Sequence, residues 1–89
     1  MIEKQLTVLN SLGLHARATA RLVSLAMTFD SDVQISNGDT SVDAKSMLAV
    51  MTLGSSQHST LTVRADGNDE ERAMESIEAL FNSRFEEAE

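Results

Sequence analysis

One short segment contains residue types that could carry group-transfer chemistry. Gly13-Leu14-His15-Ala16-Arg17 places a histidine between an alternating segment at 2–9 and an amphipathic segment at 16–27. These patterns predict a strand followed by a helix, so His15 should lie at the helix N-terminus. Unpaired backbone N–H groups and the positive end of the macrodipole make such a position an anion site. There they also favour the neutral, nucleophilic imidazole, and the Arg17 guanidinium could anchor phosphate.

This segment therefore indicates a histidine that carries phosphate. The competing interpretations are a surface histidine without a role and, for Arg17, an exposed arginine paired with solvent or a nearby acid. Arg21 lies one helical turn further on, where a solvated face is expected, with possible steering of a partner.

A second segment begins at Ser46. It precedes the apolar residues 47–53 and is followed by Gly54, which predicts a short helix with Ser46 as N-cap and Gly54 at C′. Ser46 also fits a regulatory phosphorylation site, because the helix N-terminus and Lys45 would favour the added charge, and that charge would repel an acidic partner.

Three residues of this short helix cannot all face inward. Met47, Leu48 and Met51 either share a small core or form an exposed patch that adapts to several partners, as methionine-rich surfaces do.

The other elements must position these two segments. Residues 33–36 and 40–44 predict a hairpin through Asn37-Gly38, and 60–65 predict a further strand. Asp69 is a candidate N-cap for a helix over 70–85, and the acidic residues after Phe85 should fray. The expected order is βαββαβα, an α+β fold whose four strands are covered on one face by three helices.

Composition limits the function classes. The 89 residues fit one domain over 1–89, and the absence of cysteine excludes disulfides and thiolate metal sites.

The net charge of −7 arises from the last 24 residues, which carry nine acids against two arginines; a basic spot remains around Arg17, Arg21 and Lys45. Nucleic-acid binding is disfavoured, and we expect no metal, no cofactor and no membrane association. With no signal-peptide pattern, we expect a cytoplasmic monomer.

Two motifs at matching spacing resemble the HPr family of phosphocarriers. They are Gly13-Leu14-His15-Ala16-Arg17 and Lys45-Ser46-Met47 with Val50-Met51-Thr52-Leu53-Gly54, and the likeness spans essentially the whole chain. The ending Ala79-Leu80-Phe81-Asn82-Ser83 is similar to the nitrogen-branch paralogue of that family. This resemblance implies an open-faced antiparallel β-sandwich.

The resemblance also implies a relay rather than an enzyme. His15 would accept a phosphoryl group on Nδ1 from phosphoenolpyruvate-charged enzyme I and pass it to an enzyme IIA-type acceptor, with Arg17 on the phosphoryl oxygens. Ser46 would be the target of a serine kinase, and the helices at 16–27 and 47–53 would form the docking surface, with Arg21, Lys45, Met47, Leu48 and Met51 as its candidate residues.

One residue departs from the family's pattern, which has proline directly after the arginine where this chain has Ala18. Ala18 adds a free N–H and loosens the helix start. The alternative function is a regulatory module whose phosphorylation state is read by partners with little onward transfer.

Overall fold

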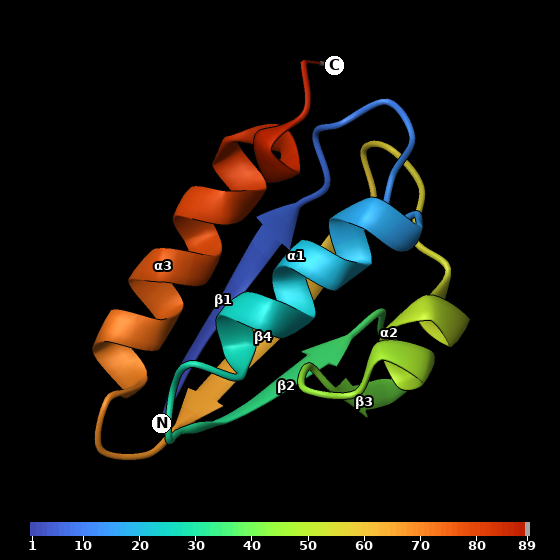
Figure 1. Ribbon diagram of the computed structural model, residues 1–89. Coiled ribbons are helices and arrows are strands. Elements are labelled where there is room, and N and C mark those ends of the chain that lie inside the picture. Colours follow the sequence, from blue (N-terminus) through green and yellow to red (C-terminus); the bar gives the residue numbers. More distant parts are fainter. Residues whose placement is uncertain (89) are drawn as a thin grey trace.

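The expected order of elements is confirmed in a computed structural model that describes residues 1–88 (Figure 1). There are four strands and three α-helices in the order βαββαβα, and a 3₁₀ turn follows the last helix. The elements are β1 (Ile2–Thr7), α1 (Ala16–Ala26), β2 (Asp32–Ser36), β3 (Ser41–Asp43), α2 (Met47–Leu53), β4 (Thr60–Asp66), α3 (Glu70–Asn82) and η1 (Arg84–Glu86).

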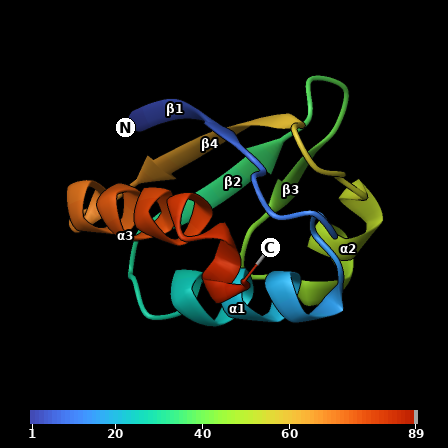
Figure 2. The same cartoon turned by 90° about the horizontal axis from the view of Figure 1, so that it is seen from above.

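The strands form one antiparallel sheet in the order β1-β4-β2-β3. All three helices lie on the same face of this sheet, which leaves the other face open (Figure 2). The predicted α+β architecture, an open four-stranded sheet covered on one side, is therefore confirmed. Within residues 1–88, no helix combines the length and the apolar character that a bilayer crossing demands.

The core lies between this sheet and the helices because the strands alternate. Val33 and Ile35 of β2 pair with Ala65 and Val63 of β4, and all four are fully buried. Lys4 interrupts the apolar alternation of β1, which is an edge strand, and its ammonium pairs with Glu78 of α3 at 2.9 Å. A charged residue is tolerated on that face because the edge leaves it a route to solvent.

The local signals predicted α2 correctly. It runs from Met47 to Leu53, and the Ser46 hydroxyl accepts a hydrogen bond from the Ala49 N–H at 3.3 Å. Gly54 ends the helix in the left-handed conformation, with φ of 61°.

The expectation for the last helix was wrong at its C-terminal end. α3 ends at Asn82, and the next residues form η1, in which Arg84, Phe85 and Glu86 have φ of 57°, 54° and 63°. This left-handed turn reverses the backbone so that Phe85 still reaches the core, where its ring centroid lies 4.8 Å from that of Phe81.

Asp69 stands at the N-cap position of α3 as predicted, but its carboxylate does not cap the helix. It accepts hydrogen bonds from the Asp30 and Ser31 N–H groups, each at 2.9 Å, and from the Ser31 hydroxyl. The Ser31 hydroxyl and then the Asp30 N–H lower the pKa of Asp69 to about 2. Asp69 therefore ties the loop before β2 to the start of α3.

Candidate functional site

The loop before α1 fixes the position of His15. Gly13 has φ of 65°, and a Cβ there would lie 2.5 Å from the Ser55 carbonyl oxygen, so only glycine fits. The Leu14 N–H donates to that same carbonyl at 2.9 Å, and the Leu14 side chain is buried. The loop is therefore held against the segment that follows α2, which brings the two motifs together.

His15 is the N-cap residue of α1, as predicted. Its backbone is extended, and its carbonyl accepts the first helical hydrogen bond from the Thr19 N–H at 2.9 Å. The N–H groups of residues 16–18 precede that bond and have no acceptor within the helix. The His15 side chain makes no capping bond and is 28% exposed, so its ring is accessible beside these donors.

The ring of His15 contacts a residue from the far end of the chain. Nε2 lies 2.5 Å from Oε2 of Glu87, whose other oxygen accepts a hydrogen bond from Nδ2 of Asn10 at 2.8 Å. Asn10 is fully buried, and the same Nδ2 also donates to the Gly13 carbonyl at 2.7 Å. Burial opposes ionisation of Glu87, but the hydrogen bonds from Asn10 and His15 and the charges of His15 and Arg17 outweigh it and lower its pKa.

The expectation that the acidic residues after Phe85 fray was therefore wrong for residues 86–88, which belong to a segment, residues 84–88, here called the strap. The strap is anchored by the buried Phe85 ring, and the Arg21 guanidinium donates to the Phe85 carbonyl at 2.5 Å. The side chain of Glu87 is only 12% exposed. Apolar burial and one charged hydrogen bond thus hold the strap across the start of α1.

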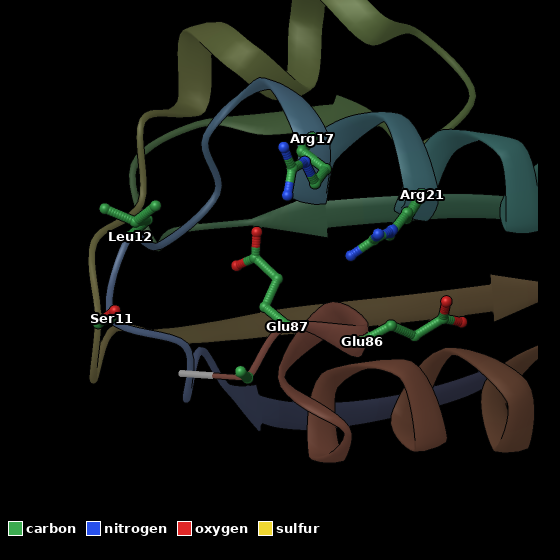
Figure 3. A pocket seen from close by; sticks show the side chains of 7 residues that line it. Ser11, Leu12, Arg17, Arg21, Glu86 and Glu87 are labelled. Atoms are coloured by element: carbon green, nitrogen blue, oxygen red, sulfur yellow. The ribbon is translucent and has the colours of Figure 1, made fainter.

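Two arginines of α1 and two glutamates of the strap face a shared open pocket next to His15. Figure 3 shows the side chains of Arg17 and Glu87 pointing toward one another across it. Arg17 is exposed, so its guanidinium can reach an anion bound at the start of α1. The pocket is lined by Ser11, Leu12, Arg17, Arg21, Glu86, Glu87 and Ala88.

A histidine at a helix start, beside an arginine and free N–H groups, is a geometry for phosphate, and the comparisons with known proteins agree with it. Residues 2–83 match the family described as PTS HPr component phosphorylation site. The chain belongs to the HPr family.

Individual members are similar over their whole length. The phosphocarrier protein HPr of Xylella fastidiosa (strain Temecula1) is 48% identical over 98% of this chain and 98% of its own. The phosphocarrier protein NPr of Shewanella violacea is 38% identical over 98% of this chain and 96% of its own. The crystal structure of HPr-C-His from Thermoanaerobacter tengcongensis gives a TM-score of 0.96 at 36% identity and covers 100% of both chains. HPr proteins are phosphocarriers of the phosphotransferase system, which relay phosphate without being catalytic enzymes.

One residue of the predicted basic spot lies elsewhere in the fold. The ammonium of Lys45 donates to the Phe29 carbonyl at 2.9 Å. Phe29 follows the C-terminal end of α1, and the 11 residues of that helix separate it from His15 by about 16 Å. The basic spot is therefore formed by Arg17 and Arg21, without Lys45.

Exposed apolar residues lie on α2 and in the loop before α1. Leu48 and Met51 of α2 are 78% and 43% exposed, whereas Met47 packs against the core. Leu12, which is 70% exposed, lines the pocket beside His15. The two interpretations of α2 thus each hold in part: Met47 is inward, and Leu48 and Met51 form an exposed patch.

Two site residues were missed by the sequence analysis, Asn10 and Glu87. Glu87 is separated from His15 by 72 positions, so no local spacing connects them. The only signal was the pair Phe81 and Phe85, whose apolar character shows that the chain beyond Asn82 returns to the core. Within residues 1–88, no group of three or more His, Asp or Glu side chains is arranged to hold a metal ion.

Proposed function

We propose that His15 accepts a phosphoryl group from phosphoenolpyruvate-charged enzyme I and passes it to an enzyme IIA-type acceptor. The observation that carries this proposal is the His15 ring itself: Glu87 engages Nε2, which leaves Nδ1 as the free ring nitrogen of the residue that begins α1. The N–H groups of residues 16–18 and the Arg17 guanidinium supply donors for the phosphoryl oxygens.

The transfer needs positioning and charge stabilisation rather than acid–base chemistry. The lone pair on Nδ1 forms a bond to phosphorus while the bond between phosphorus and the donor group on enzyme I breaks, and that electron pair leaves with the donor. Onward transfer is the same step in reverse, with the His15 ring as the leaving group.

Labelled phosphoenolpyruvate and enzyme I provide the direct test. We expect His15→Ala to take up no acid-labile label. The chain's other histidine, the exposed His58, supplies the matched control, and His58→Ala should be labelled like wild type. Label retained in His15→Ala would overturn the proposal.

A chase separates a carrier from a regulatory module. Labelled protein mixed with an enzyme IIA-type acceptor should lose its label to that acceptor within the mixing time. A label that stays on the protein would favour the module whose state is read by partners. The proposal also places the relay in the cytoplasm, because phosphoenolpyruvate is a cytoplasmic metabolite.

For docking, the proposal assigns the exposed patch of Leu48 and Met51 with the half-buried Met47, and adds the two basic residues Arg21 of α1 and Lys45, which precedes the N-cap of α2. Apolar surface exposed to this extent next to a reactive group is typical of a contact with partners. Leu48→Asp should weaken binding to enzyme I, whereas Met27→Asp, at a comparably exposed residue beyond α1, should not.

For regulation, the proposal assigns phosphorylation to Ser46. The Ser46 hydroxyl already faces the N-terminus of α2, where added negative charge is favourable, and the docking patch lies on the same helix. Ser46→Asp should therefore dock on enzyme I more weakly than Ser41→Asp, which adds the same charge on β3. Equal affinities would contradict the repulsion mechanism.

A further inference from the structure

Glu87 binds the ring nitrogen of His15 that does not receive phosphate. Its Oε2 lies 2.5 Å from Nε2, and its Oε1 accepts from the buried Asn10 at 2.8 Å. The carboxylate is thus fixed at both oxygens, on the side of the ring away from Nδ1.

The chemistry of the two groups decides which of them carries the hydrogen. The pKa of Glu87 is lowered, because the hydrogen bonds from Asn10 and His15 outweigh the effect of burial, so Glu87 is an ionised carboxylate at neutral pH. A carboxylate only accepts hydrogen bonds, so Nε2 must donate. A neutral imidazole has one N–H, and placing it on Nε2 leaves the lone pair on Nδ1 free.

We propose that Glu87 is a positioning residue for phosphoryl transfer, which holds the Nε2–H tautomer of His15 and presents Nδ1 to the incoming phosphorus. This inference rests on the proposed function of His15 as the phosphoryl acceptor. Asn10 in turn orients Glu87, so that a buried amide, a carboxylate and an imidazole form one chain of hydrogen bonds. The logic is that of a catalytic triad, in which a carboxylate fixes the histidine tautomer.

The same contact accounts for the charge that develops during transfer. When Nδ1 bonds to phosphorus, the ring keeps its hydrogen on Nε2 and gains a positive charge. Glu87 already faces that hydrogen, so the charge forms against a carboxylate without any proton moving. When the acceptor takes the phosphoryl group, the electron pair of the N–P bond returns to Nδ1 and the ring becomes neutral again.

The strap makes the position of Glu87 a property of the fold rather than of a mobile tail. Phe85 is fully buried, and Arg21 binds its carbonyl two residues before Glu87. A change confined to the Glu87 carboxyl group therefore leaves the anchor of the strap intact.

Glu87→Gln tests the proposal with little change of shape. The glutamine amide has one acceptor oxygen, whereas the carboxylate that it replaces accepts from two donors, the Nε2–H of His15 and the Asn10 amide. The amide also lacks the negative charge. Glu75→Gln is the matched control: it makes the same change of charge on an exposed side chain of α3, away from the pocket, and within residues 1–88 no hydrogen bond or ion pair of the Glu75 carboxylate is found.

Two measurements decide the outcome. Long-range ¹H–¹⁵N spectra of the unphosphorylated proteins report the His15 tautomer. Of the two variants, we expect only Glu87→Gln to raise the population of the tautomer with the hydrogen on Nδ1. The rate of label uptake from enzyme I should fall about tenfold in Glu87→Gln, as expected for loss of one hydrogen bond to a charged group. It should be unchanged in Glu75→Gln.

Equal tautomer populations and equal uptake rates in the two variants would overturn the proposal. A faster uptake in Glu87→Gln would overturn it too, because Glu87 would then obstruct the site. The tautomer measurement needs no partner protein, so its result is distinct from a failure of the proposed function, which would appear as label retained in His15→Ala.

Discussion

Replacing Phe85 with alanine tests whether one buried ring holds the strap on the site. Phe85 has no exposed surface and packs on Phe81 with a centroid distance of 4.8 Å and an angle of 56° between the rings. Truncation of a buried phenylalanine to alanine costs ~3–5 kcal/mol when the surroundings stay in place and leave a cavity. That figure is the upper bound for this variant.

The backbone of η1 opposes this stabilisation. Arg84, Phe85 and Glu86 are all left-handed and none is glycine. Such a conformation costs about 1–2 kcal/mol for each residue, so the three together store an energy comparable to what the Phe85 ring contributes. Without the ring, the strap should leave the site and relax. Because this relaxation recovers at least ~3 kcal/mol of backbone strain against a loss of up to ~5 kcal/mol, we expect the free energy of unfolding to fall by no more than about 2 kcal/mol.

The assay follows stability and the strap separately. The chain has no tryptophan or tyrosine, so urea unfolding should be followed by far-UV circular dichroism rather than by fluorescence. Amide exchange of residues 84–88 and the ¹⁵N shift of His15 Nε2 report whether Glu87 still binds the ring. Phe85→Leu retains an apolar anchor and should keep the strap in place with a smaller loss of stability.

Two results would refute this reasoning. A loss of the full ~3–5 kcal/mol with amide exchange still slow would mean that a cavity forms and that the left-handed turn carries little strain. Unchanged stability with the contact between Glu87 and His15 intact would mean that the strap is held by something other than Phe85.

Three further predictions follow from other residues of the fold. Asp69, whose pKa is lowered to about 2 from an ordinary 3.8 first by the Ser31 hydroxyl, stabilises the fold above about pH 4 and loses that contribution as the pH falls through 2. Asp69→Asn should therefore flatten the fall in urea midpoint between these pH values, and an unchanged slope would count against the assignment. Ser46→Ala should lower the free energy of unfolding by about 1 kcal/mol through loss of the α2 cap, measured by the same urea titration; a neutral result would show that the 3.3 Å bond contributes nothing. Arg84→Gly should raise the free energy of unfolding by about 0.5–1 kcal/mol. Glycine removes the steric cost of the left-handed conformation, and this gain exceeds the entropy that glycine adds to the unfolded chain. A destabilised variant would show that Arg84 is not strained.

The sequence predicted best where a local rule decides the structure. α2 has the predicted bounds because Ser46 caps it and Gly54 takes the left-handed conformation that ends it. The hairpin at Asn37-Gly38 and the alternating strands were likewise set by neighbours in the chain. His15 was correctly placed at the start of α1 for the same reason: a strand, a glycine turn and an amphipathic segment follow in immediate succession.

The predictions failed where one residue spacing is compatible with two backbone conformations. Phe81 and Phe85 are four residues apart, as on one face of a helix, and the pattern predicted a helix to Phe85. The chain instead changes handedness after Asn82, and Phe85 reaches Phe81 from a left-handed turn. The prediction for Asp69 failed for another reason. Asp69 stands at the N-cap position, but its carboxylate binds three donors of the loop at Asp30 and Ser31 instead of capping the helix. That loop is distant in sequence, so no local pattern indicates the contact.

If His15 carries the phosphoryl group as proposed, the reversibility of the transfer follows from how the charges at the site are shared. Before transfer, Arg17 points toward Glu87, but no direct bond between the two is found within residues 1–88. A phosphoryl group on Nδ1 can therefore attract the guanidinium without first breaking an ion pair, while Glu87 keeps its hydrogen bond to Nε2. Arg17 should consequently stabilise the phosphorylated state and Glu87 the charged ring in both directions. A carrier needs this division, because a site that held phosphate with every available group would accept it readily and release it slowly.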